Sequence, residues 1–122
     1  MALKIGDKAP DFTLFNQDGE AVSLSSFKGK NVVVLFFPAA NTGACTTEMC
    51  TFRDELKEYE NLNAQLLGIS VDTHFALKMF HEKNNYNFPL LSDFNKKVIK
   101  DYEVVLDVFV PGKFDYLNTA KR

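Results

Sequence analysis

The sequence predicts an α/β fold, because stretches with strand character alternate along the chain with stretches of helical periodicity. Residues 31–37 include the run Val-Val-Val-Leu-Phe-Phe, which lacks polar alternation and is typical of a central strand covered on both faces. Residues 45–62 instead carry apolar side chains at helical spacing. The 122 residues are enough for a hydrophobic core, and we expect residues 1–122 to form a single domain.

The N-terminal part is expected to be rich in loops and to hold a small β-hairpin. Residues 12–15 and 21–24 are strand candidates, and the segment Gln-Asp-Gly-Glu at 17–20 supplies the residue types of a tight turn between them. Ser25 and Ser26 are expected to cap a brief helical turn that follows.

The middle of the chain is expected to continue as helix, strand, helix. The first helix spans residues 45–62, with an inward stripe of Cys45, Met49, Phe52, Leu56 and Tyr59. Residues 65–71 form a second buried strand. The next helix covers residues 73–84, is capped by Asp72 or Thr73, and has an apolar side of Phe75, Met79 and Phe80. The remaining elements are a short strand at 89–91, a helix at about 95–102 and a strand candidate at 104–110.

Composition limits the classes of function. With 46% apolar residues, 25% charged residues and a net charge of −2, the chain is typical of a globular protein and gives no basis for binding nucleic acid or an anionic membrane. No apolar run approaches the roughly 20 residues of a membrane helix, and the first residues lack the apolar region of a secretory signal. We therefore expect a cytoplasmic, reducing setting, in which the 2 cysteines are catalytic, redox-sensing or free rather than a permanent disulfide.

The stretch from Phe36 to Cys50 carries the most chemical information. The strand at 31–37 stops at Pro38, a short polar loop follows, and a helix opens with Cys45 in or near its first turn. The N–H groups at a helix start lack intrahelical partners, and the peptide dipoles place partial positive charge there. A thiol at such a position ionises more easily than free cysteine.

The spacing Pro-x-x-x-Thr-x-x-Cys, formed by Pro38, Thr42 and Cys45, resembles the active-site signature of the peroxiredoxins of the AhpC/TSA superfamily. The second cysteine, Cys50, makes the bacterioferritin-comigratory type the most similar branch. Further matching segments lie at residues 6–12, 68–72 and 88–93. The resemblance implies a thioredoxin-like fold with an N-terminal extension, a central mixed sheet and flanking helices.

The resemblance also implies that the chain lacks the family's C-terminal strands and closing helix, which would follow Lys121 and Arg122. We therefore expect an open sheet edge, together with either marginal stability or a partner that fills the gap. A homodimer or a higher homo-oligomer of this chain is the expected form of that partner.

By the same resemblance, Cys45 is the nucleophile that attacks a peroxide and becomes a sulfenic acid; the alternative is a buried structural cysteine. Thr42 is expected both to cap the helix and to offer its hydroxyl to the thiolate or the substrate, and Pro38 is expected to shape the loop and cover the sulfur. The resemblance pairs Glu48 with Arg122, the arginine that stabilises the thiolate and the departing oxygen. For Glu48 the alternative is a residue favoured by the first helical turn, and for Arg122 a frayed terminus.

Cys50 is the candidate resolving cysteine, the thiol that would form a disulfide with oxidised Cys45. In an intact helix residues five apart lie roughly 8–9 Å apart at Cα, whereas a disulfide needs less than about 7 Å. Resolution would therefore require the first turns of the helix to unwind. The alternative is that Cys50 is a small buried hydrophobe and Cys45 works alone.

The expected function is that of a thiol peroxidase, which reduces hydrogen peroxide or organic hydroperoxides and is recycled by a thioredoxin-like donor or another thiol. No metal or organic cofactor is expected. Two alternatives remain: a thioredoxin-like disulfide reductase, disfavoured because the Cys-x-x-Cys spacing is absent, and a catalytically weakened redoxin that acts as an oligomerising or binding module.

Overall fold

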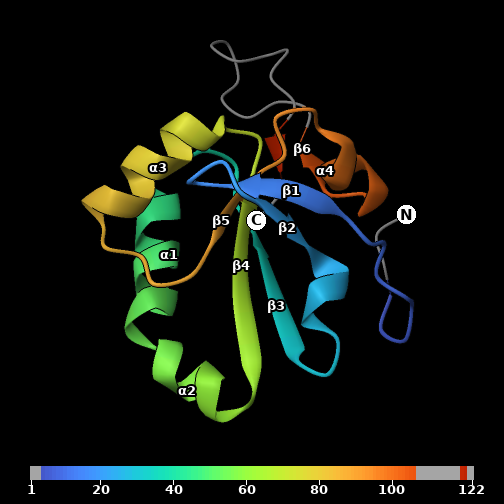
Figure 1. The fold of residues 1–122 in the computed structure, drawn as a ribbon. Helices are drawn as coiled ribbons and strands as arrows, with labels where there is room; N and C mark the ends of the chain where they lie inside the picture. Colours follow the sequence, from blue (N-terminus) through green and yellow to red (C-terminus); the bar gives the residue numbers. More distant parts are fainter. Residues whose placement is uncertain (1–3, 107–118, 121–122) are drawn as a thin grey trace.

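The computed structural model describes residues 4–106 and 119–120 and has an α/β architecture (Figure 1). A mixed five-stranded sheet has the order β2-β1-β5-β4-β3. Its strands are β1 (Thr13–Asn16), β2 (Ala21–Ser23), β3 (Asn31–Phe36), β4 (Ala64–Ser70) and β5 (Leu90–Ser92). The predicted α/β fold with a central mixed sheet flanked by helices is confirmed.

The strands β3, β4 and β5 are parallel to one another, while β1 runs antiparallel to both β5 and β2. The prediction that β3 is a central strand is wrong for the described residues, because β3 stands at the end of the sheet and pairs with β4. Its apolar run has another cause: Leu35 packs into the core on one face of the sheet, and Phe36 packs into the core on the other face.

The described helices are α1 (Gly43–Asp54), α2 (Leu56–Asn61), α3 (His74–Lys83) and α4 (Lys97–Asp101), with a 3₁₀ turn η1 (Leu24–Phe27). The single helix predicted over residues 45–62 is wrong, because the chain changes direction at Glu55 (φ −99°, ψ 9°) between α1 and α2. The break lets α2 lie across the beginning of β4 (Figure 1). The inward stripe is confirmed, since Cys45 and Met49 are buried and the three later members pack against the same cluster.

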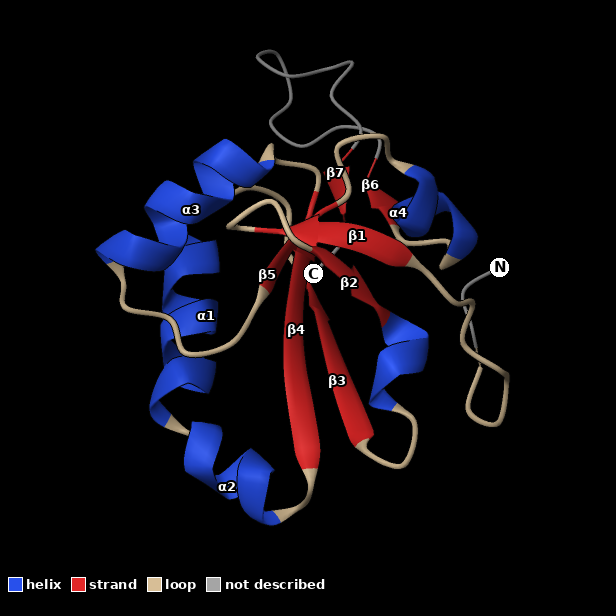
Figure 2. Cartoon of the chain, viewed as in Figure 1, coloured by secondary structure: helices blue, strands red, loops and turns tan. Residues whose placement is uncertain are grey.

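Helices cover both faces of the sheet (Figure 2). One face carries α1 and α3 over a cluster that includes Leu35, Phe37, Cys45, Met49, Leu66, Leu77, Phe80 and Leu90. The other face carries α4 and η1 over a cluster that includes Phe12, Leu67, Ile69, Leu91, Val98 and Tyr102. Leu66 and Leu67 are neighbours in β4 and belong to opposite clusters, as the alternation of side chains along a strand requires.

The third helix, α3, is capped by Thr73, whose side-chain oxygen accepts a hydrogen bond from the Ala76 N–H at 3.2 Å. The predicted apolar side is only partly correct. Phe80 is buried together with Leu77, three positions earlier, whereas Phe75 and Met79 are each 71% exposed. The helix is therefore rotated so that Leu77 and Phe80 face the sheet.

The predicted hairpin is confirmed as β1 and β2, and its turn is held by Asn16, whose side-chain oxygen accepts the N–H groups of Asp18 and Glu20 at 2.9 and 3.0 Å. The predicted serine cap is wrong. Ser25 and Ser26 lie inside η1, because the chain becomes helical two residues earlier than predicted, after an N-cap at Ser23 that makes no side-chain capping bond.

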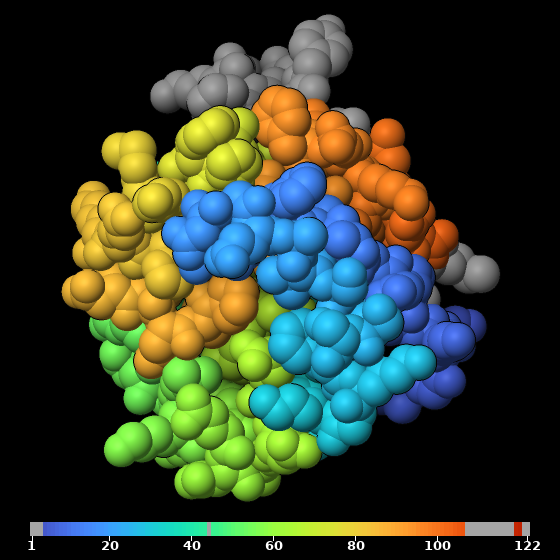
Figure 3. All heavy atoms as spheres, in the orientation of Figure 1, coloured from blue at the N-terminus to red at the C-terminus, as the bar shows by residue number. Residues whose placement is uncertain are grey.

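The segment after β5 turns at Asp93, a buried carboxylate that accepts the N–H groups of Val98 and Ile99 at 3.1 and 2.8 Å and so fixes the start of α4. The N-terminal segment, blue in Figure 3, packs beside α4, where the Tyr102 hydroxyl donates to the Pro10 carbonyl at 2.6 Å. Within residues 4–106 and 119–120, no helix has the length and apolar character needed to span a membrane.

The strand predicted at 104–110 begins as β6 (Val105–Leu106), and the rest of that prediction lies outside the described residues. The sequence did not predict its antiparallel partner, β7 (Thr119–Ala120), which stands in a polar stretch. Both residues of β7 are nevertheless buried, and Ala120 packs in a small cluster with Val71 and Ile99.

Candidate active site

Cys45 is the third residue of α1 and so lies in the first turn of the helix, as the sequence predicted. The helix begins at Gly43 after an extended N-cap residue, Thr42. The Cys45 side chain is 0% exposed and belongs to the cluster with Phe37 and Met49. The thiol therefore lies at the helix terminus where unpaired N–H groups favour a negative charge, and the adjacent core holds its position.

The loop between β3 and α1 is anchored by Asp72, for which the sequence predicts only a possible role as a helix cap. Asp72 follows β4, and its carboxylate accepts the Ala40 N–H at 2.8 Å and the Ser70 hydroxyl at 2.7 Å. Because β3 and β4 are parallel, their carboxyl ends lie side by side, and Asp72 spans the gap between them. An acidic residue directly after a buried parallel strand was the signal that could have found it.

The rest of the loop is shaped by main-chain geometry. Pro38 is buried, and the Phe37 N–H before it extends the sheet by donating to the Ile69 carbonyl at 3.1 Å. Asn41 adopts a positive φ of 63°, a conformation that asparagine tolerates better than most residues. The loop thus turns sharply just before α1 begins.

Thr42 occupies the predicted N-cap position, but the prediction that its side chain caps the helix is wrong. Its hydroxyl donates instead to the Ala39 carbonyl at 2.9 Å, and no side-chain capping bond forms. The hydroxyl thereby closes the loop onto itself, three residues back along the chain. Its role toward the thiolate or a substrate stays a prediction.

Glu48 is half-buried and lies one turn after Cys45 in α1. Its expected partner, Arg122, lies outside the described residues, so their pairing stays a prediction. Arg53, which lies further along α1, forms a salt bridge with Asp54, with 2.9 Å between Nε and Oδ1. Arg53 also donates from Nη1 to the Asn84 carbonyl, which directs the guanidinium to the connection between α3 and β5.

Cys50 is half-buried and faces polar groups. Cys45 and Cys50 are not joined in a disulfide, and both lie in the uninterrupted helix α1. The Cys50 sulfur is 3.6 Å from the Tyr86 hydroxyl and 3.8 Å from the Asn84 side-chain oxygen. No local pattern could have revealed these partners, because they follow Cys50 by 36 and 34 positions.

Burial, followed by the hydrogen bond with Cys50, raises the pKa of Tyr86 above the ordinary value of 10.0. The phenol is therefore protonated at neutral pH and can donate to the sulfur. The Cys50 thiol can in turn donate to the Asn84 oxygen, whose amide nitrogen donates to the Phe80 carbonyl at 3.1 Å. The side chains of Tyr86, Cys50 and Asn84 thus form one directional chain of hydrogen bonds.

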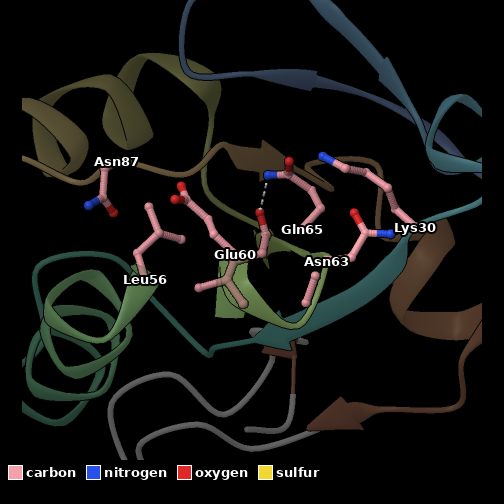
Figure 4. Close-up of a pocket in the computed structure, with 8 residues that line it drawn as sticks. Lys30, Leu56, Glu60, Asn63, Gln65 and Asn87 are labelled. Carbon is pink, nitrogen blue, oxygen red and sulfur yellow. Dashed lines mark hydrogen bonds between the residues drawn. The ribbon is translucent and has the colours of Figure 1, made fainter. Parts of the chain in front are cut away.

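A surface hollow of about 210 Å³ lies at the other end of the strands from the α1 start, near the beginnings of β3 and β4 (Figure 4). It is lined by Lys30, Leu56, Glu60, Asn63, Ala64, Gln65, Leu66 and Asn87. The Gln65 side chain there donates to the Leu66 carbonyl at 3.0 Å. Because the hollow contains no cysteine and is distant along the strands from the α1 start, we do not assign the chemistry to it. Among the described residues, no three His, Cys, Asp or Glu side chains are arranged to hold a metal ion.

The comparison with protein families agrees with this arrangement of a strand, a loop and a cysteine at a helix start. The profile of the AhpC/TSA family matches residues 5–116. The chain belongs to the AhpC/TSA family. Among its relatives, peroxiredoxin Q of Oryza sativa subsp. japonica, a protein with "chloroplastic" in its name, is 46% identical over 114 residues, which make up 92% of this chain and 52% of the relative.

A bacterial relative, a peroxiredoxin of Haemophilus influenzae named bcp, is 45% identical over 102 residues, covering 84% of this chain and 66% of that protein. Among solved structures, peroxidoxin BcpB of Mycobacterium tuberculosis is 38% identical with a TM-score of 0.80, covering 88% of this chain and 70% of that one. The resemblance to the bacterioferritin-comigratory type and the expected thioredoxin-like fold are thereby confirmed. The chain spans about half the length of the plant relatives that it matches.

Proposed function

We propose that the protein is a thiol peroxidase in which Cys45 is the nucleophile. The observation that carries the proposal is the position of Cys45 as the third residue of α1, where helix-terminal N–H groups favour a thiolate. Membership of the AhpC/TSA family and the peroxiredoxin names of the relatives support the same chemistry.

In the first step the Cys45 thiolate attacks one oxygen of hydrogen peroxide or of an organic hydroperoxide. A sulfur–oxygen bond forms, the O–O bond breaks, and the second oxygen leaves as hydroxide or alkoxide and takes up a proton. Cys45 is then a sulfenic acid. We assign Pro38 to shaping the loop, Thr42 to holding the substrate or the thiolate, and Glu48 to orienting Arg122 against the developing charge.

In the second step the Cys50 thiol attacks the sulfenic acid, so that a disulfide joins the two sulfurs and water leaves. A thioredoxin-like dithiol then reduces the disulfide, and the two thiols of α1 are restored. We further propose a homo-oligomer as the working form. The expected location is the cytoplasm, although the plant relatives carry "chloroplastic" in their names.

The test is the loss of free thiols after the reduced protein is mixed with one equivalent of hydrogen peroxide. We expect thiol loss faster than that of free cysteine at the same pH, with a decrease of about a thousandfold or more in Cys45→Ser. Cys50→Ser serves as the matched control and should keep the fast first step. Equal rates for the wild type, Cys45→Ser and free cysteine would contradict the proposal.

A further inference from the structure

The connection between α3 and β5 is tied to α1 next to Cys50. It runs alongside α1 in Figure 1. Besides the two contacts of the Cys50 sulfur, Arg53 donates to the Asn84 carbonyl, and the Asn87 side chain donates to the Arg53 carbonyl at 3.3 Å. Residues 84–87 thus hold the part of α1 from Cys50 to Arg53.

The part of α1 before this tie includes several residues with weak helical preference, among them Gly43, Thr46 and Thr47. Thr46 and Thr47 in this part, and Thr51 within the tied part, each turn the hydroxyl back to the carbonyl four residues earlier, at 2.8, 3.1 and 2.9 Å. Branching at Cβ lowers helix propensity, and this back-bonding slightly destabilises and bends helices. The first turns of α1 therefore depend on contacts with the rest of the molecule.

We propose that Tyr86, together with Asn84, is a positioning latch that controls how fast Cys50 forms a disulfide with Cys45. This inference rests on the proposed function, in which Cys50 resolves oxidised Cys45. In the folded helix the two sulfurs point about 140° apart around the axis, and the latch holds Cys50 in that direction. The disulfide forms only after the first turns unwind and Cys50 leaves Tyr86 and Asn84.

The balance of the step fits this geometry. The sulfenic acid of Cys45 and the thiol of Cys50 give a disulfide and one water. The Cys50 S–H proton, which is hydrogen-bonded to the Asn84 oxygen in the reduced form, leaves with that water. The phenol of Tyr86 takes no part in bond making. Because it stabilises only the closed form, its removal raises the population of the open, reactive form.

The test compares Tyr86→Phe with the wild type in the full chain. The removal of one hydrogen bond of ordinary strength should raise the opening of α1 about fivefold. We expect the amides of residues 46–52 to exchange hydrogen about fivefold faster in the reduced variant, as measured by mass spectrometry. After peroxide addition, the disulfide should form faster by the same factor, with less Cys45 sulfinic acid at high peroxide.

Tyr102→Phe is the matched control, because it also removes a tyrosine hydroxyl bond, the one to Pro10, on the other face of the sheet. It should leave amide exchange in α1 and the ratio of disulfide to sulfinic acid unchanged. Arg53→Met removes a second tie without touching Cys50 and should change both readouts in the same direction as Tyr86→Phe.

Unchanged or slower α1 exchange and disulfide formation in Tyr86→Phe would overturn the latch. The same conclusion would follow if Tyr102→Phe accelerated α1 amide exchange and disulfide formation as much as Tyr86→Phe does. A wild-type protein whose Cys45 fails to react with peroxide would overturn the proposed function instead. The exchange comparison, which needs no peroxide, would still decide whether Tyr86 holds α1 closed.

Discussion

Cys45 and Cys50 belong to one helix, yet different interactions hold them. Cys45 is fully buried in the apolar cluster that contains Met49. Cys50 is half-buried and contacts the hydroxyl of Tyr86 and the amide oxygen of Asn84. The comparison shows that the same helix can fix one thiol through packing and keep the other in place through hydrogen bonds that open more easily. The first arrangement suits a nucleophile that must be held in place while it attacks the peroxide, and the second suits a group that must move before the disulfide forms.

The largest expected effect concerns the buried apolar cluster around Cys45. Met49 is 0% exposed, so Met49→Ala should lower the free energy of unfolding by about 3 kcal/mol through the lost apolar contacts and the cavity. Met79→Ala is the matched control, since Met79 is 71% exposed and its loss should cost less than about 0.5 kcal/mol. Urea unfolding followed by circular dichroism measures the free energy of unfolding of both variants. Equal losses in Met49→Ala and Met79→Ala would contradict the role assigned to the buried cluster.

A smaller effect is expected where the active-site loop is anchored. Asp72→Ala leaves the Ala40 N–H and the Ser70 hydroxyl without their carboxylate partner and should lower the free energy of unfolding by about 2 kcal/mol. It should also slow the oxidation of Cys45, because the loop before α1 loses its tie. Asp18→Ala, at an exposed residue in the β1–β2 turn, is the control. A stable Asp72→Ala protein with unchanged Cys45 oxidation would show that the anchor is not needed.

The smallest effect is the dependence of stability on pH that Tyr86, a hydrogen-bond partner of Cys50, contributes. Burial raises the pKa of Tyr86 in the folded protein above its ordinary value of 10.0, so above pH 10 the unfolded chain loses this proton before the folded one. The contribution of Tyr86 to stability is therefore fully present below pH 10 and is lost as the pH rises beyond it. The free energy of unfolding should fall with pH more steeply in the wild type than in Tyr86→Phe. Parallel curves between pH 9 and 11 would refute this assignment.

Much of the fold followed from local patterns in the sequence. The apolar runs of β3 and β4, the turn after Asn16 and the cap at Thr73 each depend on a few neighbouring residues in the sequence. The failures have a common cause. The break at Glu55, the rotation of α3 toward Leu77 and the edge position of β3 depend on what the element packs against, and periodicity alone does not contain that information.

The candidate site divides in the same way. Cys45 was correctly placed in the first turn of the helix, because the proline, the loop and the helix start are contiguous in the chain. The Thr42 hydroxyl was misassigned because a capping residue can turn back to its own loop, and the choice of partner is set by the loop geometry. Asp72 and Tyr86 meet α1 and its loop only through the folded sheet. The position of Asp72 directly after a buried strand was a local signal, whereas no local pattern pointed to the contact of Tyr86 with Cys50.

The most direct test of the account is to locate the first oxidised sulfur. The reduced Cys50→Ser variant is treated with less than one equivalent of hydrogen peroxide and then with dimedone, which labels sulfenic acids, and the peptides are analysed by mass spectrometry. The account predicts that Cys45 carries the label, and that wild-type protein under the same conditions gives a Cys45–Cys50 disulfide. An unlabelled Cys45 in the variant, or a sulfenic acid found on Cys50 rather than on Cys45 in the wild type, would contradict it.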